Sequence, residues 1–242
     1  MKIVIGHLYP HLMNMYADRG NVICLERRCR WRGLDVELRN IGPGPLRHAA
    51  ELDILLVGGG QDREQCLASQ DLVETKGPVL REAIGDGLVA LAVCGGYQLF
   101  GEYYRDHTGA ELRGIEVLPA HTTHPGADSQ RCIGNIVTTW NGQKLVGFEN
   151  HGGRTYLHDP EAALATVVSG YGNNGADQTE GAQWKNAYGT YLHGSLLPKN
   201  PAFADHLILQ ALKRRYGVTS LPPLDDAVEL AAHERALKIA GG

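Results

Sequence analysis

The chain has 242 residues, a formal net charge of −4 and a sequence pI near 6.2. Hydrophobic residues make up 43% and charged residues 21%, a balance typical of globular proteins that excludes wholesale disorder. The slightly acidic charge gives no electrostatic case for binding nucleic acid or an anionic membrane. No apolar stretch approaches the roughly 20 residues of a membrane-spanning helix, and the five cysteines include no Cys-x-x-Cys pair. We therefore expect a cytoplasmic protein with no membrane span, disulfide framework or zinc ribbon.

The first half of the chain alternates short apolar runs with helical patterns. Because short apolar runs bounded by Gly or Pro are typical of buried parallel strands, strands are predicted over 2–8, 35–41, 52–57 and 88–93. Helices are predicted over 14–32, 63–72, 78–85 and 97–100. This alternation predicts an α/β fold with a central, mostly parallel sheet and helices on both faces.

The pattern changes after residue 110. Short strands with little helix between them are predicted at 115–118, 132–139, 144–148 and 165–169, and we expect them to add antiparallel edge structure. A last strand over 187–192 is followed by helices over 203–216 and 225–240. We accordingly divide the chain into one α/β domain, 3–216, and a C-terminal helical tail, 217–242.

Cys94 lies between a predicted strand and a predicted helix, in the segment Val93-Cys94-Gly95-Gly96. A nucleophile on a sharp strand-to-helix turn needs small neighbours, because the backbone there is strained and a bulky side chain would block the substrate. The first N–H groups of the following helix can hold a developing oxyanion. Cys94 is therefore a candidate nucleophile; the alternative is a buried structural cysteine, which is common for a free thiol.

A thiol nucleophile needs a base within hydrogen-bond reach, and two histidines compete for that role. His193 ends the predicted strand 187–192, so it would project from the carboxyl edge of the sheet, where α/β proteins bind ligands. His151 is followed by two glycines, but it comes after a segment assigned to the antiparallel half. We favour His193; either histidine could instead be a loop residue with a local partner.

The glycines after the third predicted strand, Gly58-Gly59-Gly60, have two interpretations. Backbone N–H groups in such a turn can complete an oxyanion hole, and the segment lacks the Gly-Lys-Ser/Thr ending of a P-loop. Gly59, Gly60 and Gly95 are therefore the candidate oxyanion donors. A plain glycine-rich turn is the alternative.

His121 and His124 suggest a metal pair, but the segment that carries them is predicted to be an irregular loop. No cysteine or carboxylate lies at ligand spacing from them. We therefore assign no metal site.

Several long motifs in the same order resemble a known family. Val93-Cys94-Gly95-Gly96-Tyr97-Gln98 and Gly189-Thr190-Tyr191-Leu192-His193-Gly194 are similar to motifs of class I glutamine amidotransferases of the cobyric acid synthase type. More narrowly, five segments resemble the glutaminase subunits of lipid II isoglutaminyl synthases. These segments are 7–9, 14–21, 58–65, 147–155 and 193–201. Because several long motifs agree in order, the likeness is far more specific than a cysteine and a histidine alone.

The resemblance implies a flavodoxin-like domain that hydrolyses L-glutamine to glutamate and ammonia. It implies that Cys94 forms a γ-glutamyl thioester, that His193 is the general acid and base, and that Arg131 holds the substrate. A guanidinium suits the carboxylate of glutamine because of its bidentate fork; a surface arginine at the start of a strand is the alternative. No cofactor is expected in this chain.

The resemblance also implies a partner. Ammonia would pass to a separate Mur-ligase-like synthetase subunit in a heterodimer. That subunit would use ATP to amidate the D-glutamate of the lipid II stem peptide, a step of peptidoglycan synthesis at the inner face of the membrane.

Position 195 departs from the wider superfamily. Most class I amidotransferases carry a glutamate two residues after the catalytic histidine, and this chain has Ser195 there. A serine cannot stabilise an imidazolium as a carboxylate does. Either the site works as a Cys/His dyad or a carboxylate comes from elsewhere, and the resemblance favours an aspartate of the partner ligase. We therefore expect the isolated chain to be a weak glutaminase.

Two other functions stay open. The chain could be an amidotransferase for another acceptor, such as a corrinoid carboxylate, but for that function we expect a fused ATP-binding synthetase domain and find no sign of one in the sequence. It could also be a non-catalytic regulatory subunit with a degenerate site. The presence of Cys94 and His193 in their expected settings argues against this, whereas Ser195 leaves it open.

Overall fold

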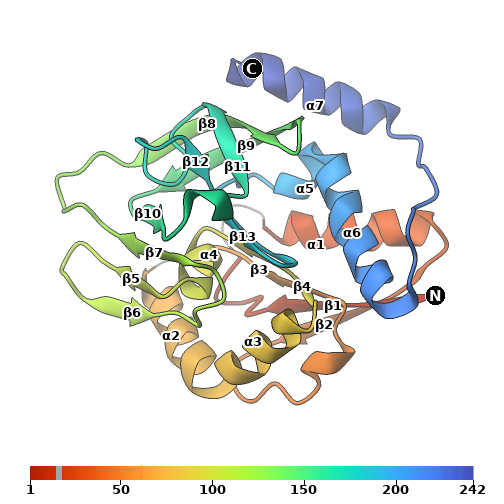
Figure 1. Cartoon of the computed structure of the whole chain (residues 1–242), viewed down its shortest axis with the longest axis horizontal. Helices are drawn as coiled ribbons and strands as arrows, with labels where there is room; N and C mark the ends of the chain where they lie inside the picture. Colours follow the sequence, from red (N-terminus) through yellow and green to blue (C-terminus); the bar gives the residue numbers. More distant parts are fainter. Residues whose placement is uncertain (15–17, 61, 242) are drawn as a thin grey trace.

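A six-stranded sheet with the order β13-β14-β4-β3-β1-β2 forms the centre of the molecule (Figure 1). We describe a computed structural model over residues 1–14, 18–60 and 62–241. The strands of this sheet are β1 (Lys2–Leu8), β2 (Asp35–Ile41), β3 (Ile54–Val57), β4 (Val89–Val93), β13 (Ala182–Trp184) and β14 (Ala187–Thr190). All neighbours pair in parallel except β13, which runs antiparallel to β14. The predicted mostly parallel sheet is confirmed.

Helices cover both faces of this sheet. Alternate residues of β1 point to opposite faces: Ile3 and Ile5 belong to one hydrophobic core and Val4 to the other. Figure 1 shows helices on both sides of the sheet. The helices are α1 (Arg19–Trp31), α2 (Asp62–Asp71), α3 (Gly77–Gly85), α4 (Gly95–Phe100), α5 (Leu196–Lys199) and α6 (Pro201–Tyr216). A π-helical turn, η3 (Leu72–Lys76), joins α2 to α3, and η2 (Ala49–Glu51) and η4 (Pro160–Ala162) are short 3-10 helices.

The first helix begins later than predicted. We expected it to start at Asn14, but Asn14 is not helical and α1 begins at Arg19. Residues 15–17, which the prediction included, lie outside the described residues. The α5 helix was not predicted, because its four residues are too few to set up a periodic pattern.

The second half of the chain forms two more four-stranded sheets, with the orders β10-β7-β5-β6 and β12-β11-β8-β9. Their pairs are antiparallel except β5 with β7. The strands are β5 (Tyr103–Arg105), β6 (Glu111–Arg113), β7 (Ala120–Thr123), β8 (Cys132–Trp140), β9 (Gln143–His151), β10 (Arg154–Leu157), β11 (Ala165–Ser169) and β12 (Thr179–Glu180). Additional antiparallel strands are therefore confirmed, but among the described antiparallel strands only β13 belongs to the central sheet, at the edge opposite β2.

Two predictions in this half are wrong. Residues 115–118 form no strand, because the N–H groups of Ile115 and Val117 donate to carbonyl groups of Leu99 and Phe100 at the end of α4. The segment of His121 is not an irregular loop, because β7 pairs with β10 and aligns His121 with Tyr156.

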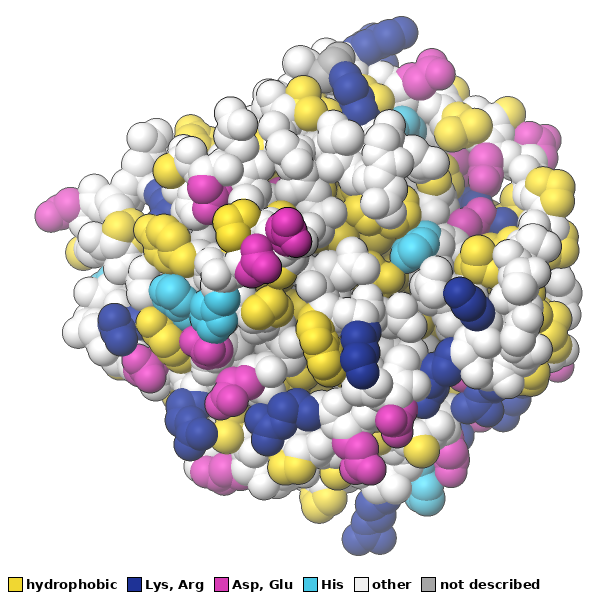
Figure 2. All heavy atoms as spheres, viewed as in Figure 1, with side chains coloured by type: hydrophobic (Ala, Val, Ile, Leu, Met, Phe, Trp, Pro, Cys, Tyr) yellow, Lys and Arg dark blue, Asp and Glu magenta, His cyan; other side chains and the backbone are white. Residues whose placement is uncertain are grey.

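The final helix is confirmed as α7 (Ala227–Ala240), which crosses the β8–β9 side of the molecule (Figure 1). None of its residues is buried. The division of the chain at residue 216 stays a prediction. In the described part of the chain, no helix combines the length and the apolar character needed to cross a membrane. Acidic and basic side chains are interspersed over the face seen in Figure 2.

Candidate active site

Cys94 directly follows β4 and forms the N-cap of α4, with φ +52° and ψ −107°. A non-glycine residue with positive φ is strained, and such strain is concentrated at functional sites. The Cys94 N–H donates to the Thr190 carbonyl at 2.9 Å, which ties the turn to the end of β14. The thiol side chain is partly exposed. The strand-to-helix turn predicted for Cys94 is thus present.

Small residues next to Cys94 are required by close backbone packing. The Gly96 N–H donates to the Gly58 carbonyl at 3.1 Å, which joins the start of α4 to the end of β3. A Cβ on Gly96 would lie 2.9 Å from the carbonyl oxygens of both Gly58 and Val57. Backbone atoms cannot move away as a flexible side chain can, so a glycine is needed at this position.

His193 is fully buried and lies beside Cys94. Its backbone forms a two-bond bridge with Phe148 of β9, in which the His193 N–H donates at 2.8 Å and the Phe148 N–H at 3.2 Å. A Cβ on Gly59 would lie 3.3 Å from His193 Cε1 and 3.5 Å from Cys94 Cβ, so both side chains meet over Gly59. The Cys94 sulfur is also close enough to act electrostatically on the His193 imidazole. The structure therefore brings the two predicted catalytic residues together.

The surroundings of His193 favour its protonated form. Burial lowers the pKa of the imidazole, but the neighbouring Cys94 sulfur and the Asp18 carboxylate outweigh burial and raise the pKa to about 10. A protonated imidazole next to a thiolate is the state from which a cysteine attacks a carbonyl carbon.

Asp18 is a site residue that the sequence analysis did not assign. It lies at the start of α1 and is 4% exposed. Its Oδ1 is 3.5 Å from His193 Nδ1, and its Oδ2 accepts a hydrogen bond of 2.8 Å from the Gly59 N–H. Two signals could have found it: Asp18 belongs to one of the motifs that carry the resemblance, and it follows the strand predicted at 2–8, whose carboxyl end faces the site.

The Asp18–Gly59 hydrogen bond bears on the three candidate oxyanion donors. The Gly59 N–H is directed to Asp18. By contrast, the Gly60 nitrogen lies 3.2 Å from the position that a Cβ on Gly95 would occupy, so the Gly60 and Gly95 backbones are close neighbours. The oxyanion roles of Gly59, Gly60 and Gly95 stay predictions, and the N–H of Gly59 is already bonded to Asp18.

His151 is held in a different network. Its ring stacks on Tyr191 with a centroid separation of 3.6 Å, and its Nδ1 is 2.8 Å from the Gly153 carbonyl oxygen. Its Nε2 is 3.9 Å from Glu149, and burial lowers the pKa of the ring. His151 therefore fits the interpretation as a histidine with local partners.

Arg131 precedes β8 and is exposed. Its Nε and Nη2 donate to Asn150 Oδ1 at 3.1 and 2.9 Å, which fixes the guanidinium beside the end of β9. Its role in holding the substrate stays a prediction.

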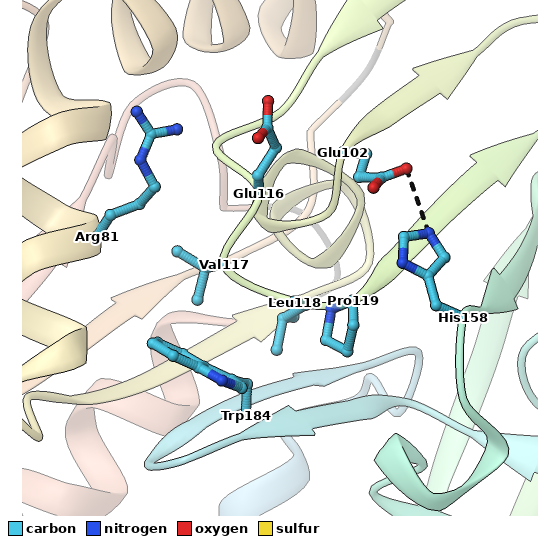
Figure 3. A pocket seen from close by; sticks show the side chains of 8 residues that line it. All are labelled: Arg81, Glu102, Glu116, Val117, Leu118, Pro119, His158 and Trp184. Carbon is cyan, nitrogen blue, oxygen red and sulfur yellow. Dashed lines mark ion pairs between the residues drawn. The ribbon is translucent and has the colours of Figure 1, made fainter.

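A cluster of possible metal ligands contains His121, but its other members are Glu102 and His158 and not His124. Glu102, His121 and His158 each place one potential ligand atom within 4.8 Å of the others. Glu102 and His158 form an ion pair of 3.2 Å at the rim of a surface cavity of about 420 Å³ (Figure 3). His121 stacks between Tyr103 and Tyr156, at centroid distances of 5.2 and 5.7 Å. Ion pairing and stacking thus account for all three side chains, and we assign no metal to them.

Comparisons with known proteins show the family of the chain. Residues 4–201 match the CobB/CobQ-like glutamine amidotransferase domain. The chain is 41% identical to the lipid II isoglutaminyl synthase (glutamine-hydrolyzing) subunit GatD of Staphylococcus aureus, with 96% of this chain and 94% of that protein covered. It is 37% identical to the subunit of the same name from Streptococcus pneumoniae, with 93% and 86% covered. A cobyric acid synthase of Moorella thermoacetica is 28% identical, with 67% of this chain and 33% of that protein covered.

Solved structures confirm the fold. A structure of PurLQS from Thermotoga maritima has a TM-score of 0.55 at 14% identity and covers 98% of this chain and 100% of that chain. A crystal structure of a glutamine amidotransferase has a TM-score of 0.56 at 13% identity, with 86% and 98% covered. The resemblance inferred from the motifs is confirmed: this chain belongs to the family of CobB/CobQ-like glutamine amidotransferase domains.

Proposed function

We propose that this chain is a glutaminase subunit that hydrolyses L-glutamine through a Cys94 thioester and supplies ammonia to a Mur-ligase-like partner. The observation that carries the proposal is the strained turn of Cys94 with the buried His193 beside it. Neither a structural cysteine nor a degenerate site requires this pairing.

The first half of the reaction forms the thioester. The Cys94 thiolate attacks the carbonyl carbon of the glutamine side chain, and the oxygen gains negative charge. We propose the Gly60 and Gly95 N–H groups as the donors that stabilise it, because the Gly59 N–H is already bonded to Asp18. As the carbon–nitrogen bond breaks, the His193 imidazolium gives its proton to the leaving nitrogen, and ammonia departs.

The second half restores the enzyme. Neutral His193 takes a proton from water, and the resulting hydroxide attacks the thioester carbon. The carbon–sulfur bond breaks, glutamate leaves, and Cys94 returns as a thiolate beside an imidazolium. Each turnover therefore consumes one water and releases one ammonia, with no cofactor in this chain.

The comparisons support the acceptor that we propose. Identity to the GatD subunits is 41% and 37% over more than nine-tenths of this chain, against 28% over 67% for the cobyric acid synthase. We accordingly assign the ammonia to the α-carboxylate of D-glutamate in the lipid II stem peptide. The partner synthetase would activate that carboxylate with ATP, at the inner face of the membrane.

The glutaminase step is tested by glutamine-dependent ammonia release. The purified chain is assayed alone and with a co-expressed Mur-ligase-like subunit, each with Cys94→Ala. Cys66→Ala serves as the matched control, because Cys66 is an exposed thiol on α2. We expect release that is lost in Cys94→Ala and kept in Cys66→Ala. If the unmodified chain releases no ammonia either alone or with the partner subunit, the proposal is contradicted.

The acceptor is tested separately by mass spectrometry. The complex receives ATP, glutamine and either lipid II or a corrinoid with free carboxylates. We expect a mass decrease of about 1 Da per amidated carboxylate on lipid II only, since –OH becomes –NH₂. Modification of the corrinoid alone would keep the glutaminase assignment and overturn the acceptor.

A further inference from the structure

We propose that the rim of the Cys94 site is the docking surface for the synthetase subunit, and that it receives an acidic face of that partner. Four cationic side chains define this rim: Arg19, Arg63, Arg154 and Lys199. The inference rests on the proposed glutaminase function and adds to it the chemistry of the surface that the partner must present.

Lys199 lies next to the segment that carries the catalytic histidine. It is the last residue of α5, and its Nζ is 2.8 Å from the position that a Cβ on Gly194 would take. Gly194 directly follows His193 and is exposed. The Lys199 carbonyl accepts a hydrogen bond of 2.7 Å from His233 of α7, which fixes the backbone that carries the amine. Lys199 therefore places a positive charge beside the catalytic base, at the surface of the molecule.

The environment of the Lys199 amine favours an incoming carboxylate. The side chain is partly buried, and this burial lowers the pKa of the amine. A cation that has lost part of its hydration is stabilised when a carboxylate replaces the lost water contacts with a charged hydrogen bond. An acidic side chain of a partner that covers this surface would supply that bond.

Two further cations of the rim lie at the starts of α1 and α2. Arg19 directly follows Asp18, whose carboxylate is 3.5 Å from His193 Nδ1. Arg63 lies in the first turn of α2, close after Gly59, whose N–H donates to Asp18. Both arginines are exposed. They therefore border the site on the side of β1 and β3.

Arg154 borders the site on the side of β9. It begins β10, directly after the turn from β9, and β9 is bonded to His193 through Phe148. Its guanidinium donates to the carbonyl oxygens of Gly152 and Gln130 at 2.9 and 2.5 Å. These neutral acceptors fix the group in place without cancelling its charge.

The charges of the rim are not compensated by this chain. Among the described residues, no carboxylate forms an ion pair with any of the four cations, whereas cations elsewhere, such as Arg28 and Arg105, are paired with carboxylates. The chain as a whole has a net charge of −4, so positive charge is not a general property of its surface. Unpaired cations on three sides of one site favour a partner of the opposite charge.

The fate of the ammonia explains why a protein should cover this rim. Ammonia that escapes into water is protonated, and ammonium does not attack an activated carboxylate. A synthetase that uses the ammonia must therefore dock over the site that releases it. Complementary charges around the site would set the register of the two subunits and raise the rate of association.

The test measures the Kd of the complex between this chain and the purified Mur-ligase-like subunit by calorimetric titration. Lys199→Glu and Arg63→Glu each reverse one charge of the rim, and Lys199→Arg keeps the charge. The matched control is Lys213→Glu, an exposed lysine in the last turn of α6. The Tm of each variant is measured to exclude misfolding. Because no glutamine or ATP is added, the result does not depend on turnover.

We expect each reversal in the rim to raise Kd about tenfold or more, because an attractive pair becomes a repulsive one. Lys199→Arg and Lys213→Glu should leave Kd within about twofold of the unmodified chain. The effect of the reversals should shrink in about 0.5 M salt, which screens exposed charges. A Kd that neither reversal changes would overturn the docking surface and leave the glutaminase function standing.

Two further outcomes separate the docking surface from the proposed function. If the unmodified chain binds the synthetase with the expected charge dependence but releases no ammonia, the glutaminase function is wrong and the docking surface stands. If the chain binds vesicles of phosphatidylglycerol, loses them in Lys199→Glu and keeps its Kd for the synthetase, the rim is a membrane contact and the docking surface is wrong.

Charge exchange then identifies the acidic group of the partner. Exposed aspartates and glutamates of the synthetase are changed to lysine one at a time and titrated with Lys199→Glu. We expect at least one of these changes to restore Kd to within about threefold of the unmodified complex, and to weaken binding of the unmodified chain. If none of them restores binding, Lys199 does not pair with an acidic residue of the partner.

Discussion

Ser195 packs against Gly20 so closely that a Cβ at residue 20 would overlap its side chain. This contact joins the segment after β14 to the first turn of α1, and therefore sets how near Asp18 comes to His193. We expect Gly20→Ala to destabilise the fold by about 1 to 3 kcal/mol, as overpacking of a close contact does, and to lower glutaminase activity. Thermal unfolding and ammonia release measure the two effects. The double variant Gly20→Ala/Ser195→Gly should recover most of the lost stability and activity. If Ser195→Gly recovers neither, the contact between residues 20 and 195 is not the cause of the loss.

Arg131 is expected to act on substrate binding more than on the chemical step. Its guanidinium is fixed by Asn150 at the end of β9. A charged hydrogen bond contributes about 1.5 to 3 kcal/mol, so Arg131→Ala should raise KM for glutamine about tenfold to hundredfold. Steady-state kinetics of ammonia release measure this, with Arg131→Lys retaining the charge but not the bidentate fork. An unchanged KM in Arg131→Ala would mean that another group holds the substrate carboxylate.

Glu180 should make stability depend on pH. Burial raises the pKa of this carboxyl from 4.5 to about 8, although hydrogen bonds from the Tyr191 N–H and the Thr190 hydroxyl oppose the shift. The folded state then keeps a proton that the unfolded state releases, so stability falls as pH rises from 4.5 to about 8. Urea unfolding of the wild type and of Glu180→Gln at both ends of this pH range measures how much Glu180 contributes to the change in stability.

The Glu180 comparison removes the contribution of other groups. We expect the wild type to lose about 2 to 4 kcal/mol more than Glu180→Gln across the range, because the amide mimics the neutral acid. Parallel losses in the two proteins would place the pH dependence elsewhere.

Glutamine hydrolysis is expected to be independent of metal ions. The proposed nucleophile is a thiolate and the proposed acid is an imidazolium, so neither step requires a Lewis acid. Ammonia release without ATP should therefore survive EDTA, and His158→Ala, which breaks the ion pair with Glu102, should change kcat less than about twofold. Loss of activity in EDTA that zinc restores would assign the Glu102–His121–His158 cluster a role.

The parallel sheet could be predicted because strands such as Ile54–Val57 and Val89–Val93 are separate apolar runs with a helical pattern after them. The second half was harder for a physical reason. Strands of three or four residues, such as Tyr103–Arg105 and Glu111–Arg113, are too short to show a period of two. The apolar run at 115–118 was wrongly predicted as a strand for another reason. Its backbone hydrogen bonds go to the end of α4, which only the tertiary structure reveals.

The nucleophile and the base could be predicted because each follows a strand of the parallel sheet. Asp18 could not be assigned in the same way, since ten residues separate it from the end of β1 and 175 from His193. Its approach to His193 depends on how α1 returns across the sheet. Its contacts with His193 and Gly59 identify it in the structure, whereas in the sequence it has only its motif and its position after the strand 2–8.

The four segments that bear the site follow β1, β3, β4 and β14, which are consecutive in the sheet. Neighbouring strands are held about 4.8 Å apart by their ladder of hydrogen bonds, so the spacing of Asp18, Gly59, Cys94 and His193 depends on all four strands being paired in register. None of these residues can take up its place while one strand is detached. Catalytic competence should therefore emerge late in folding and in one step, and partly folded chains should be inert toward glutamine instead of weakly active.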